Sequence, residues 1–308
     1  MKGIWIHAFG GPEVLRLEDT PSPELADGEV LVRILAASVN PVDYKIRQGG
    51  YPAVGDDKLP LILGRDVAGV VDRVGPGGDA FSVGDEVFAM LPLDRGGYAE
   101  FVAVSAEVCA RQPEGADAAH AASAPLAGLT AWQGLFDHGG LQAGQTVLIH
   151  GAGGGVGHLA VQFARASGAI VIATGRGEDH DLLKGLGATE VIDYQSQRFE
   201  TQVREVDVVF DLVGGQTQER SWDVLKPGGV LVSTLTQPSQ EKAAARRARG
   251  VRYTAHPDGR QLARIADLVA AGEVTLVIDR TYDLGEAAEA HRRLENEHVQ
   301  GKIVLVVD

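Results

Sequence analysis

The chain has 308 residues, enough for two domains with separate cores, and its formal net charge of −14 argues against a nucleic-acid partner, which needs concentrated lysine and arginine. No apolar run approaches the roughly 20 residues of a membrane span, and the N-terminus lacks the basic-then-apolar pattern of a secretory signal. Cys109 is the only cysteine, so no intrachain disulfide can form and a cytoplasmic location is expected.

Residues 1–125 contain short strand-like segments separated by turn signals. Proline and glycine clusters such as Pro21-Ser22-Pro23 and Gly75-Pro76-Gly77-Gly78 interrupt them. Their regular spacing predicts a β-rich, barrel-like first domain. An alanine-rich helical pattern follows over 113–135. The strand-like segments are 4–6, 15–18, 29–35, 67–74, 83–88 and 98–104.

A glycine-rich motif lies between two apolar runs at 145–176. The pattern predicts a strand at 146–149, a turn at 151–157 with five glycines, a helix from Val156 closed by Gly168, and a second strand at 169–173. Glycines allow the backbone to approach a pyrophosphate, and the N-terminal end of the helix attracts the anion. Because strand, turn, helix and strand follow within about thirty residues, the motif predicts a dinucleotide-binding site.

Two features of this motif depart from the commonest form. Aligned on Gly157, the first glycine of the dinucleotide pattern is Ala152 and the second is Gly154. The second strand ends in Thr174-Gly175-Arg176, where an NAD site usually has a carboxylate for the ribose 2′-hydroxyl. Arginine suits a 2′-phosphate, so the motif favours NADPH over NADH.

The remainder of the chain alternates between strands and helices. This order fits a doubly wound parallel sheet, a Rossmann domain over 126–255, and residues 256–308 are expected to complete the first domain. The basic cluster at 242–252 is interpreted as a solvated helix or loop. The predicted strands are 190–194, 207–213, 230–236 and 301–307, and the predicted helices are 182–186, 261–271 and 287–295.

With these landmarks in place, the chain resembles the medium-chain dehydrogenase/reductase superfamily over essentially its whole length, and within it the zinc-free quinone oxidoreductase (zeta-crystallin-like) branch. The order and spacing of the markers carry the resemblance. It implies a GroES-like catalytic domain, a Rossmann cofactor domain and an active-site cleft between them. The markers include Ser38-Val39-Asn40-Pro41-Val42-Asp43, Leu63-Gly64-Arg65-Asp66-Val67-Ala68-Gly69, Gly97-Tyr98-Ala99-Glu100-Phe101, Leu225-Lys226-Pro227-Gly228-Gly229 and Gly301-Lys302-Ile303-Val304.

The zinc-dependent branch of this superfamily provides a check on the metal. Its members carry a catalytic Cys where this chain has Asn40 and a His where it has Arg65. Asn and Arg are not zinc ligands, and a single cysteine cannot supply a four-cysteine structural site. We therefore expect no metal.

The resemblance implies an NADPH-dependent oxidoreductase that transfers a hydride to a quinone or another α,β-unsaturated carbonyl acceptor. Without a Lewis acid, charge on the acceptor oxygen must be stabilised by hydrogen bonds. By resemblance, Asn40 lies beside the nicotinamide and Tyr51 matches a tyrosine that lines the substrate pocket, which makes Tyr51 the first candidate for a hydrogen bond to the acceptor oxygen. Tyr44 and Arg47 are second choices, and Ile62 replaces a substrate-side threonine of some relatives.

The resemblance also implies the cofactor contacts. Thr130 matches a threonine at the nicotinamide, and Tyr194 a tyrosine near the 2′-phosphate, where Arg176 would supply the charge. By contrast, Asp43, Asp66 and Asp85 are interpreted as structural carboxylates, because no paired base surrounds them. The implied cofactor-binding set is Asn40, Thr130, Gly154, Gly155, Val156, Gly157, Thr174, Arg176, Tyr194, Val213, Ser233, Thr234 and Leu235.

Two further expectations concern the kind of protein and its assembly. A non-catalytic NADPH-binding redox sensor or structural protein on the same fold remains the alternative to an enzyme. Retention of the polar residues Asn40, Tyr51 and Thr130 favours the enzyme. Relatives commonly dimerise through edge strands of the Rossmann sheet, so a homodimer is expected, with the strand at 230–236 or the segment just after it at the edge.

Overall fold

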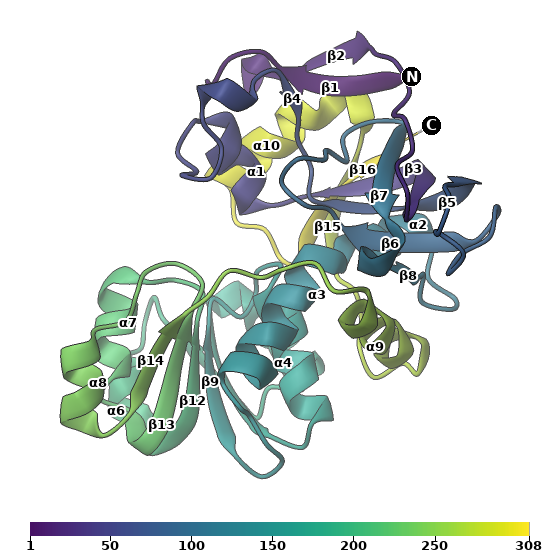
Figure 1. Cartoon of the computed structure of the whole chain (residues 1–308). Helices are drawn as coiled ribbons and strands as arrows, with labels where there is room; N and C mark the ends of the chain where they lie inside the picture. Colours follow the sequence, from purple (N-terminus) through teal and green to yellow (C-terminus); the bar gives the residue numbers. More distant parts are fainter. Residues whose placement is uncertain (308) are drawn as a thin grey trace. The chain divides into compact units, whose positions relative to one another are not determined.

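The computed structural model describes residues 1–307, and the chain divides into two compact units (Figure 1). The first unit, the catalytic unit, comprises residues 1–126 and 256–271 and the chain from 276 onwards. The second, the cofactor unit, comprises residues 127–255 and 272–275. The first boundary lies one residue from the predicted one. Residues 272–275 were predicted to belong to the first domain, but they belong to the cofactor unit.

The catalytic unit is built on two sheets. A three-stranded sheet has the order β2-β1-β4, and a seven-stranded sheet has the order β15-β16-β3-β5-β6-β8, with β7 also paired to β3. The strands are β1 (Lys2–Ile6), β2 (Arg16–Asp19), β3 (Glu29–Val39), β4 (Leu61–Ile62), β5 (Asp66–Val74), β6 (Glu86–Met90), β7 (Phe101–Ser105), β8 (Cys109–Arg111), β15 (Ile278–Asp283) and β16 (Lys302–Val306).

Strand β3 organises this unit. This eleven-residue strand pairs with β5, β7 and β16, and eight of its nine apolar or small positions from Val30 to Val39 lie below 3 % exposure. A strand buried on both faces reads as a continuous apolar run, as this one does. The helices of the unit are α1 (Pro41–Arg47), α2 (Ala118–Ser123), α9 (Gly259–Ala270) and α10 (Ala287–Asn296).

The cofactor unit has one parallel sheet of six strands in the order β11-β10-β9-β12-β13-β14. Numbered from its own first strand, that order is 3-2-1-4-5-6, the doubly wound dinucleotide-binding arrangement. Its strands are β9 (Thr146–His150), β10 (Ile170–Gly175), β11 (Glu190–Asp193), β12 (Val206–Asp211), β13 (Leu225–Ser233) and β14 (Arg249–Arg252). Its helices are α4 (Gly157–Ala166), α5 (His180–Gly185), α6 (Phe199–Gln202), α7 (Gly215–Ser221) and α8 (Gln240–Arg246); α3 (Pro125–Trp132) begins in the catalytic unit and continues into a π-helix, η4 (Gln133–His138).

The register of this sheet aligns four polar side chains at one edge. Thr174, His150, Asp211 and Ser233 pair in sequence across β10, β9, β12 and β13, each at or next to the carboxyl end of its strand. Open parallel sheets bind ligands outside this edge, where the strand order reverses. Here the reversal lies between β9 and β12.

Several predicted elements differ from the observed ones. The strand predicted at 83–88 begins only at Glu86, because Gly84 has φ +93° and Asp85 closes a turn through a 2.8 Å bond from the Ser82 amide. The strand predicted at 98–104 becomes regular at Phe101. The strand predicted at 230–236 is not an edge, since β13 pairs with both β12 and β14. The edge strand next to β13 is β14, whose residues belong to the basic cluster interpreted as a solvated helix or loop.

Candidate functional site

Asn40 stands at the start of α1, where sequence and backbone agree. It is the N-cap, Pro41 follows at the first helical position, and the Asn40 amide donates a 2.7 Å hydrogen bond to Asp43 Oδ2. Asparagine at the cap and an acidic residue three positions later form a reciprocal capping box. The cap therefore fixes Asn40 at the junction of β3 and α1, with 2 % of its surface exposed.

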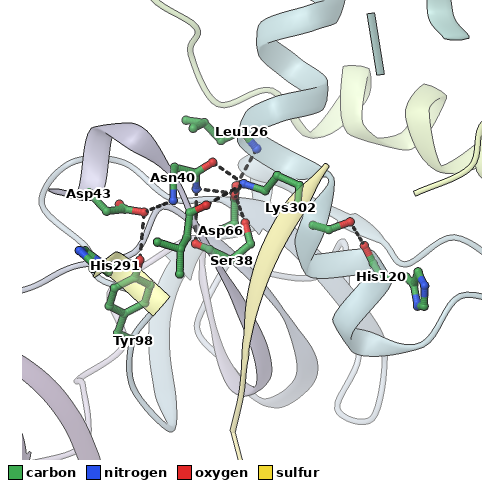
Figure 2. A network of polar contacts seen from close by, with 11 residues as sticks. Ser38, Asn40, Asp43, Asp66, Tyr98, His120, Leu126, His291 and Lys302 are labelled. Carbon is green, nitrogen blue, oxygen red and sulfur yellow. Dashed lines mark hydrogen bonds and ion pairs between the residues drawn. The ribbon is translucent and has the colours of Figure 1, made fainter. Parts of the chain in front are cut away.

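Asp66, at the start of β5, is a fully buried carboxylate with a complete set of donors (Figure 2). Its Oδ2 accepts from the Ser38 hydroxyl at 2.6 Å and from Asn40 Nδ2 at 2.8 Å. Its Oδ1 accepts from the Leu126 backbone amide at 2.6 Å. Asp66 is thus a buried, fully hydrogen-bonded carboxylate, which fits its interpretation as a structural group.

Lys302, at the start of β16, joins the same cluster from the other end of the chain. Its Nζ donates to Asn40 Oδ1 and, at 3.2 Å, to the Val39 carbonyl, and lies 3.6 Å from Asp66 Oδ2. The residue is 3 % exposed. Burial lowers the pKa of its ammonium, while the charges of Asp66 and Asp43 act in the opposite direction. The sequence analysis recognised Lys302 only as part of the Gly301–Val304 motif, because no local pattern in the sequence indicates that it contacts Asn40.

A second chain of hydrogen bonds reaches Asp43 from α10. Arg47 Nη1 lies 3.2 Å from His291 Nδ1, His291 Nε2 lies 3.2 Å from the Tyr98 hydroxyl, and Tyr98 donates to Asp43 Oδ2 at 3.0 Å. Arginine can only donate, so His291 Nδ1 must accept and its Nε2 carries the proton. The tautomer is thus fixed, and every bond in the chain points toward the Asp43 carboxylate.

Burial governs the ionisation of this chain. It raises the pKa of Asp43 to about 6, helped by Asp66 and opposed by the Asn40 amide bond. Burial and the nearby Arg47 charge lower the pKa of His291 to about 3. Asp43 Oδ1 is buried without a protein partner and lines a cavity of about 10 Å³ that Arg65 also lines. That volume is close to the roughly 10–15 Å³ that one water needs.

The residues predicted on the substrate side separate in the structure. Tyr51 is half-buried against the core, near enough to Arg65 for its phenol to influence the pKa of that guanidinium. Tyr44 lies near Glu295, whose charge adds to burial in raising the tyrosine pKa. Arg47 was a second choice for the substrate, but its side chain is 0 % exposed and bonds to the Gly10 carbonyl, His291 and Glu295. Its guanidinium is therefore used in contacts inside the protein and does not face a substrate.

Ile62, the fourth predicted substrate-side residue, pairs with Trp5 in the small sheet. It lines a cavity of about 460 Å³ within the catalytic unit, together with Trp5, Leu61, Leu93 and Phe101. Among the described residues that line this cavity, neither Tyr51 nor Tyr44 is present. Ile62 therefore does not share this cavity with Tyr51, the predicted hydrogen-bond donor.

In the cofactor unit, the glycine turn after β9 has the close packing that a dinucleotide site requires. A Cβ at Gly157 would lie 2.3 Å from the Gly151 carbonyl oxygen and 2.5 Å from Ala152 Cα. Gly151 itself has φ +70°, which glycine adopts readily. Ala152 is fully buried, so its methyl group points into the core and leaves the turn accessible. Gly154, Gly155 and Val156 are half-buried at the start of α4.

The end of β10 carries a preorganised cation. Arg176 Nε donates to the Tyr194 hydroxyl at 3.2 Å, and Arg176 Nη1 lies 3.5 Å from Glu178 Oε1. Sequence reasoning overlooked Asp179, whose carboxylate accepts from the Arg176 amide at 2.8 Å and would lie 2.7 Å from a Cβ on Gly153. Asp179 is 1 % exposed and lies against Gly153 of the turn, so the accessible charges at the strand end are those of Arg176 and Glu178.

Three of the predicted cofactor-binding residues, Val213, Ser233 and Leu235, lie around a carboxylate that the sequence analysis did not single out. Asp211 accepts from the Val213 and Gly214 amides at 3.0 and 2.8 Å, and from the Ser233 hydroxyl at 3.0 Å. Ser233 in turn accepts from the Leu235 amide at 3.2 Å. Asp211 thus fixes both loops, although the apolar run of β12 offered no sign of this role. Val213 is half exposed, and Thr234 and Leu235 are half-buried.

Two other predicted cofactor residues have inward contacts. The Thr174 hydroxyl lies 3.0 Å from His150 Nδ1, and both residues are buried. The Thr174 side chain therefore points into the unit, and only its backbone is placed to contact a ligand at the end of the strand. Thr130 is 8 % exposed, and its carbonyl accepts from the Tyr253 hydroxyl.

Metal binding was tested on the donor atoms. Within residues 1–307 no three His, Cys, Asp or Glu side chains lie close enough to hold a metal ion together. Cys109 is buried, and burial raises the pKa of its thiol to about 12, which disfavours the thiolate that binds zinc. Over the same residues, no helix has both the length and the apolar character of a membrane span.

Comparison with known proteins agrees with this geometry. The model of the alcohol dehydrogenase GroES-like domain matches residues 26–114, and that of the zinc-binding dehydrogenase family matches residues 186–305. A solved quinone oxidoreductase from Coxiella burnetii superposes with a TM-score of 0.93 and 37 % identity, covering 100 % of this chain and 99 % of that one. The chain belongs to the medium-chain dehydrogenase/reductase superfamily, in its zinc-free quinone oxidoreductase branch. The predicted family and fold class are confirmed.

Two curated relatives indicate the chemistry found nearby in this superfamily. An NADPH-dependent alkenal/one oxidoreductase of Arabidopsis thaliana is 34 % identical over 98 % of this chain and 78 % of its own. A 2-methylene-furan-3-one reductase of Solanum lycopersicum is 35 % identical over 96 % and 76 %. Both names describe reductases of carbonyl compounds conjugated to a carbon–carbon double bond.

Proposed function

We propose that this protein is an NADPH-dependent oxidoreductase that reduces quinones or other α,β-unsaturated carbonyl compounds. One observation carries the proposal: at the end of β10, next to the glycine turn, Arg176 is held by Tyr194 where an NAD enzyme has an available carboxylate. The similarity to alkenal, furanone and quinone reductases over nearly the whole chain supports the acceptor class.

The residues present fit NADPH. The turn from Gly151 to Gly157 packs tightly because Gly157 has no Cβ to meet the Gly151 carbonyl, and α4 starts there with N-terminal amides that suit a pyrophosphate. Arg176 and Tyr194 would hold the 2′-phosphate, and the loops fixed by Asp211 would hold the nicotinamide end. When bound, NADPH supplies the hydride.

The protein's own contribution is orientation and hydrogen bonding. Asn40 is held rigidly by Asp43, Asp66 and Lys302, so its amide has one orientation. Tyr51 is the proposed donor to the acceptor oxygen, where negative charge grows as the conjugated system is reduced. Arg65, a buried cation, lies near enough to Tyr51 for the two groups to interact electrostatically.

Consumption of NADPH in the presence of an acceptor panel tests this function. We expect absorbance at 340 nm to fall with ortho- and para-quinones, alkenals or enones, and to fall more slowly with NADH. Simple saturated aldehydes serve as the control, because they lack the conjugated double bond. A protein that binds NADPH yet reduces no member of the panel would be the non-catalytic alternative.

Three finer properties belong to the same proposal. Asn40 and Arg65, at the positions of the zinc ligands in zinc-dependent members, support a metal-independent reaction. The short edge strand β14, paired to β13 on one side, supports a homodimer formed by extension of the sheet. A cytoplasmic location remains a prediction that cell fractionation can check.

A further inference from the structure

Lys302, at the start of β16, is the least expected member of the buried polar cluster around Asn40 and Asp66. An ammonium has three N–H donors and no acceptor. Around Lys302 Nζ stand three oxygen atoms: Asn40 Oδ1, the Val39 carbonyl at 3.2 Å and Asp66 Oδ2 at 3.6 Å (Figure 2). Each donor therefore has a protein oxygen to face. Lys302 donates nothing to a ligand, and any effect it has on a reaction must pass through these partners.

Asn40 is the partner through which it acts. Its Oδ1 accepts from Lys302, its Nδ2 donates to Asp66 at 2.8 Å, and the other contact of Nδ2, to the Ser38 carbonyl, is long at 3.4 Å. The cation on one side and the anion on the other define which end of the amide is oxygen and which is nitrogen. The second Nδ2 hydrogen is thus the weakly held donor of the group.

The charges in this cluster do not fit a zinc ion. One matching family model is described as a zinc-binding dehydrogenase, and zinc-dependent members have Cys and His where this chain has Asn40 and Arg65. Here two buried cations, Lys302 and Arg65, accompany the two buried carboxylates Asp66 and Asp43. A zinc ion needs anionic or neutral ligands with free lone pairs, and two nearby cations repel it.

We propose that Lys302 is a positioning residue of the reductase site, whose buried ammonium orients the amide of Asn40. This inference rests on the proposed function. Oriented dipoles in a buried site act on developing charge without having to reorganise. Lys302 and Asp66, on opposite ends of the amide, thus set the direction of the Asn40 dipole, and Asp66 balances the charge of Lys302 in the buried cluster.

Three variants separate positioning from simple charge balance: Lys302→Met, Asp66→Asn and the double variant. Lys302→Met keeps the length of the side chain but leaves Asp66 buried without its cation, so the cofactor-free protein should unfold at lower urea concentration. Its kcat should fall about 10- to 100-fold, the usual loss when a residue that orients a directly contacting side chain is removed. KM for the acceptor should change less, because binding surfaces are unaltered.

The double variant decides the question. Removing both charges restores neutrality, so its urea midpoint should recover toward that of the parent relative to Lys302→Met. Its kcat should remain low, because Asn40 still lacks its cation. Lys226→Met, which breaks a lysine–aspartate pair with Asp207 on the cofactor unit, is the matched control and should keep the parent kcat.

Each outcome bears on a different statement. Recovery of both stability and kcat in the double variant overturns the inference, since Lys302 then only neutralises Asp66. Parent-like kcat in Lys302→Met overturns it as well. A wild-type chain inactive on the whole acceptor panel overturns the proposed function, whereas an active wild type with unaffected variants overturns this inference alone.

Discussion

Arg176 Nε and the Tyr194 hydroxyl are joined by a 3.2 Å hydrogen bond, although the two residues lie 18 positions apart in the chain. Arg176 follows β10 and Tyr194 follows β11, and the parallel pairing of Gly175 with Asp193 brings the two strand ends together. A guanidinium held in this way loses less side-chain entropy when it binds an anion. The bond therefore connects the sheet register directly to the choice of cofactor.

The first prediction concerns that choice. Arg176→Ala should weaken NADPH binding by about 1–3 kcal/mol, the range for one charged hydrogen-bonding partner, and leave NADH binding nearly unchanged. Tyr194→Phe removes only the supporting bond and should weaken NADPH in the same direction by less. Dissociation constants from nicotinamide fluorescence measure both. Equal losses for NADPH and NADH would mean that Arg176 does not contact the 2′-phosphate.

The second prediction concerns the donor to the acceptor oxygen. Tyr51→Phe keeps the ring that packs against the core and deletes only the hydroxyl. If its hydrogen bond strengthens as charge develops, kcat should fall roughly 10²-fold. Quinones accept electrons more readily than alkenals, so alkenal or enone reduction should suffer more. Parent rates on every acceptor would leave Tyr51 as a wall of the pocket and make Tyr44 the next candidate.

The third prediction concerns metals. Dialysis against a chelator should change neither the activity nor the melting temperature. The reason is that Asn40, Arg65 and the buried thiol of Cys109 are poor zinc ligands. Elemental analysis before and after dialysis provides the measurement. A stoichiometric zinc signal that disappears together with activity would contradict the ligand argument.

The fourth prediction concerns assembly. Strand β14 lies at the edge of the six-stranded sheet and presents unpaired backbone groups on its outer side. A second copy that pairs there would cover both edges at once. Light scattering should therefore give about twice the 32.4 kDa of one chain. A mass near that of a single chain at micromolar concentration counts against the homodimer.

The fifth prediction concerns stability in acid. His291 has an ordinary pKa of 6.5 that falls to about 3 in the folded protein, so the unfolded chain binds the extra proton. The contribution of neutral His291 to the free energy of unfolding is complete above pH 6.5. It is lost as the pH falls toward 3, by up to about 1.4 kcal/mol per pH unit. Asp43 acts in the opposite sense, because its pKa rises from 3.8 to about 6 and the folded protein takes up the proton first.

Two variants test these opposite signs by urea unfolding at pH 7 and pH 5. His291→Gln cannot titrate, so its stability should fall less than that of the parent between the two pH values. Asp43→Asn lacks the favourable protonation and should lose more. If the stability of all three proteins changed equally between pH 7 and pH 5, neither group would have the shifted native-state pKa that its burial predicts.

The sequence by itself determined the architecture, since local pattern carries it. Alternating turn signals and short apolar runs predicted the β-rich unit, and the glycine turn between apolar strands predicted the doubly wound sheet. Gly157 had to be glycine because the Gly151 carbonyl oxygen and Ala152 Cα lie 2.3 and 2.5 Å from where its Cβ would be. The position of Arg176 at a strand end could also be predicted, because the spacing of strand, turn and helix fixes where that end lies.

Tertiary structure alone decided which side chains form the polar clusters. Lys302 meets Asn40 across 262 residues, His291 meets Arg47 across 244, and Arg47 turned inward although its position suggested the substrate side. Short elements such as β14 and β15 also escaped prediction, because a few half-exposed residues leave no periodic signal. Hydrophobic periodicity records which face of an element is buried, whereas the partners of a buried charge depend on how distant strands pair, and that pairing leaves no local trace in the sequence.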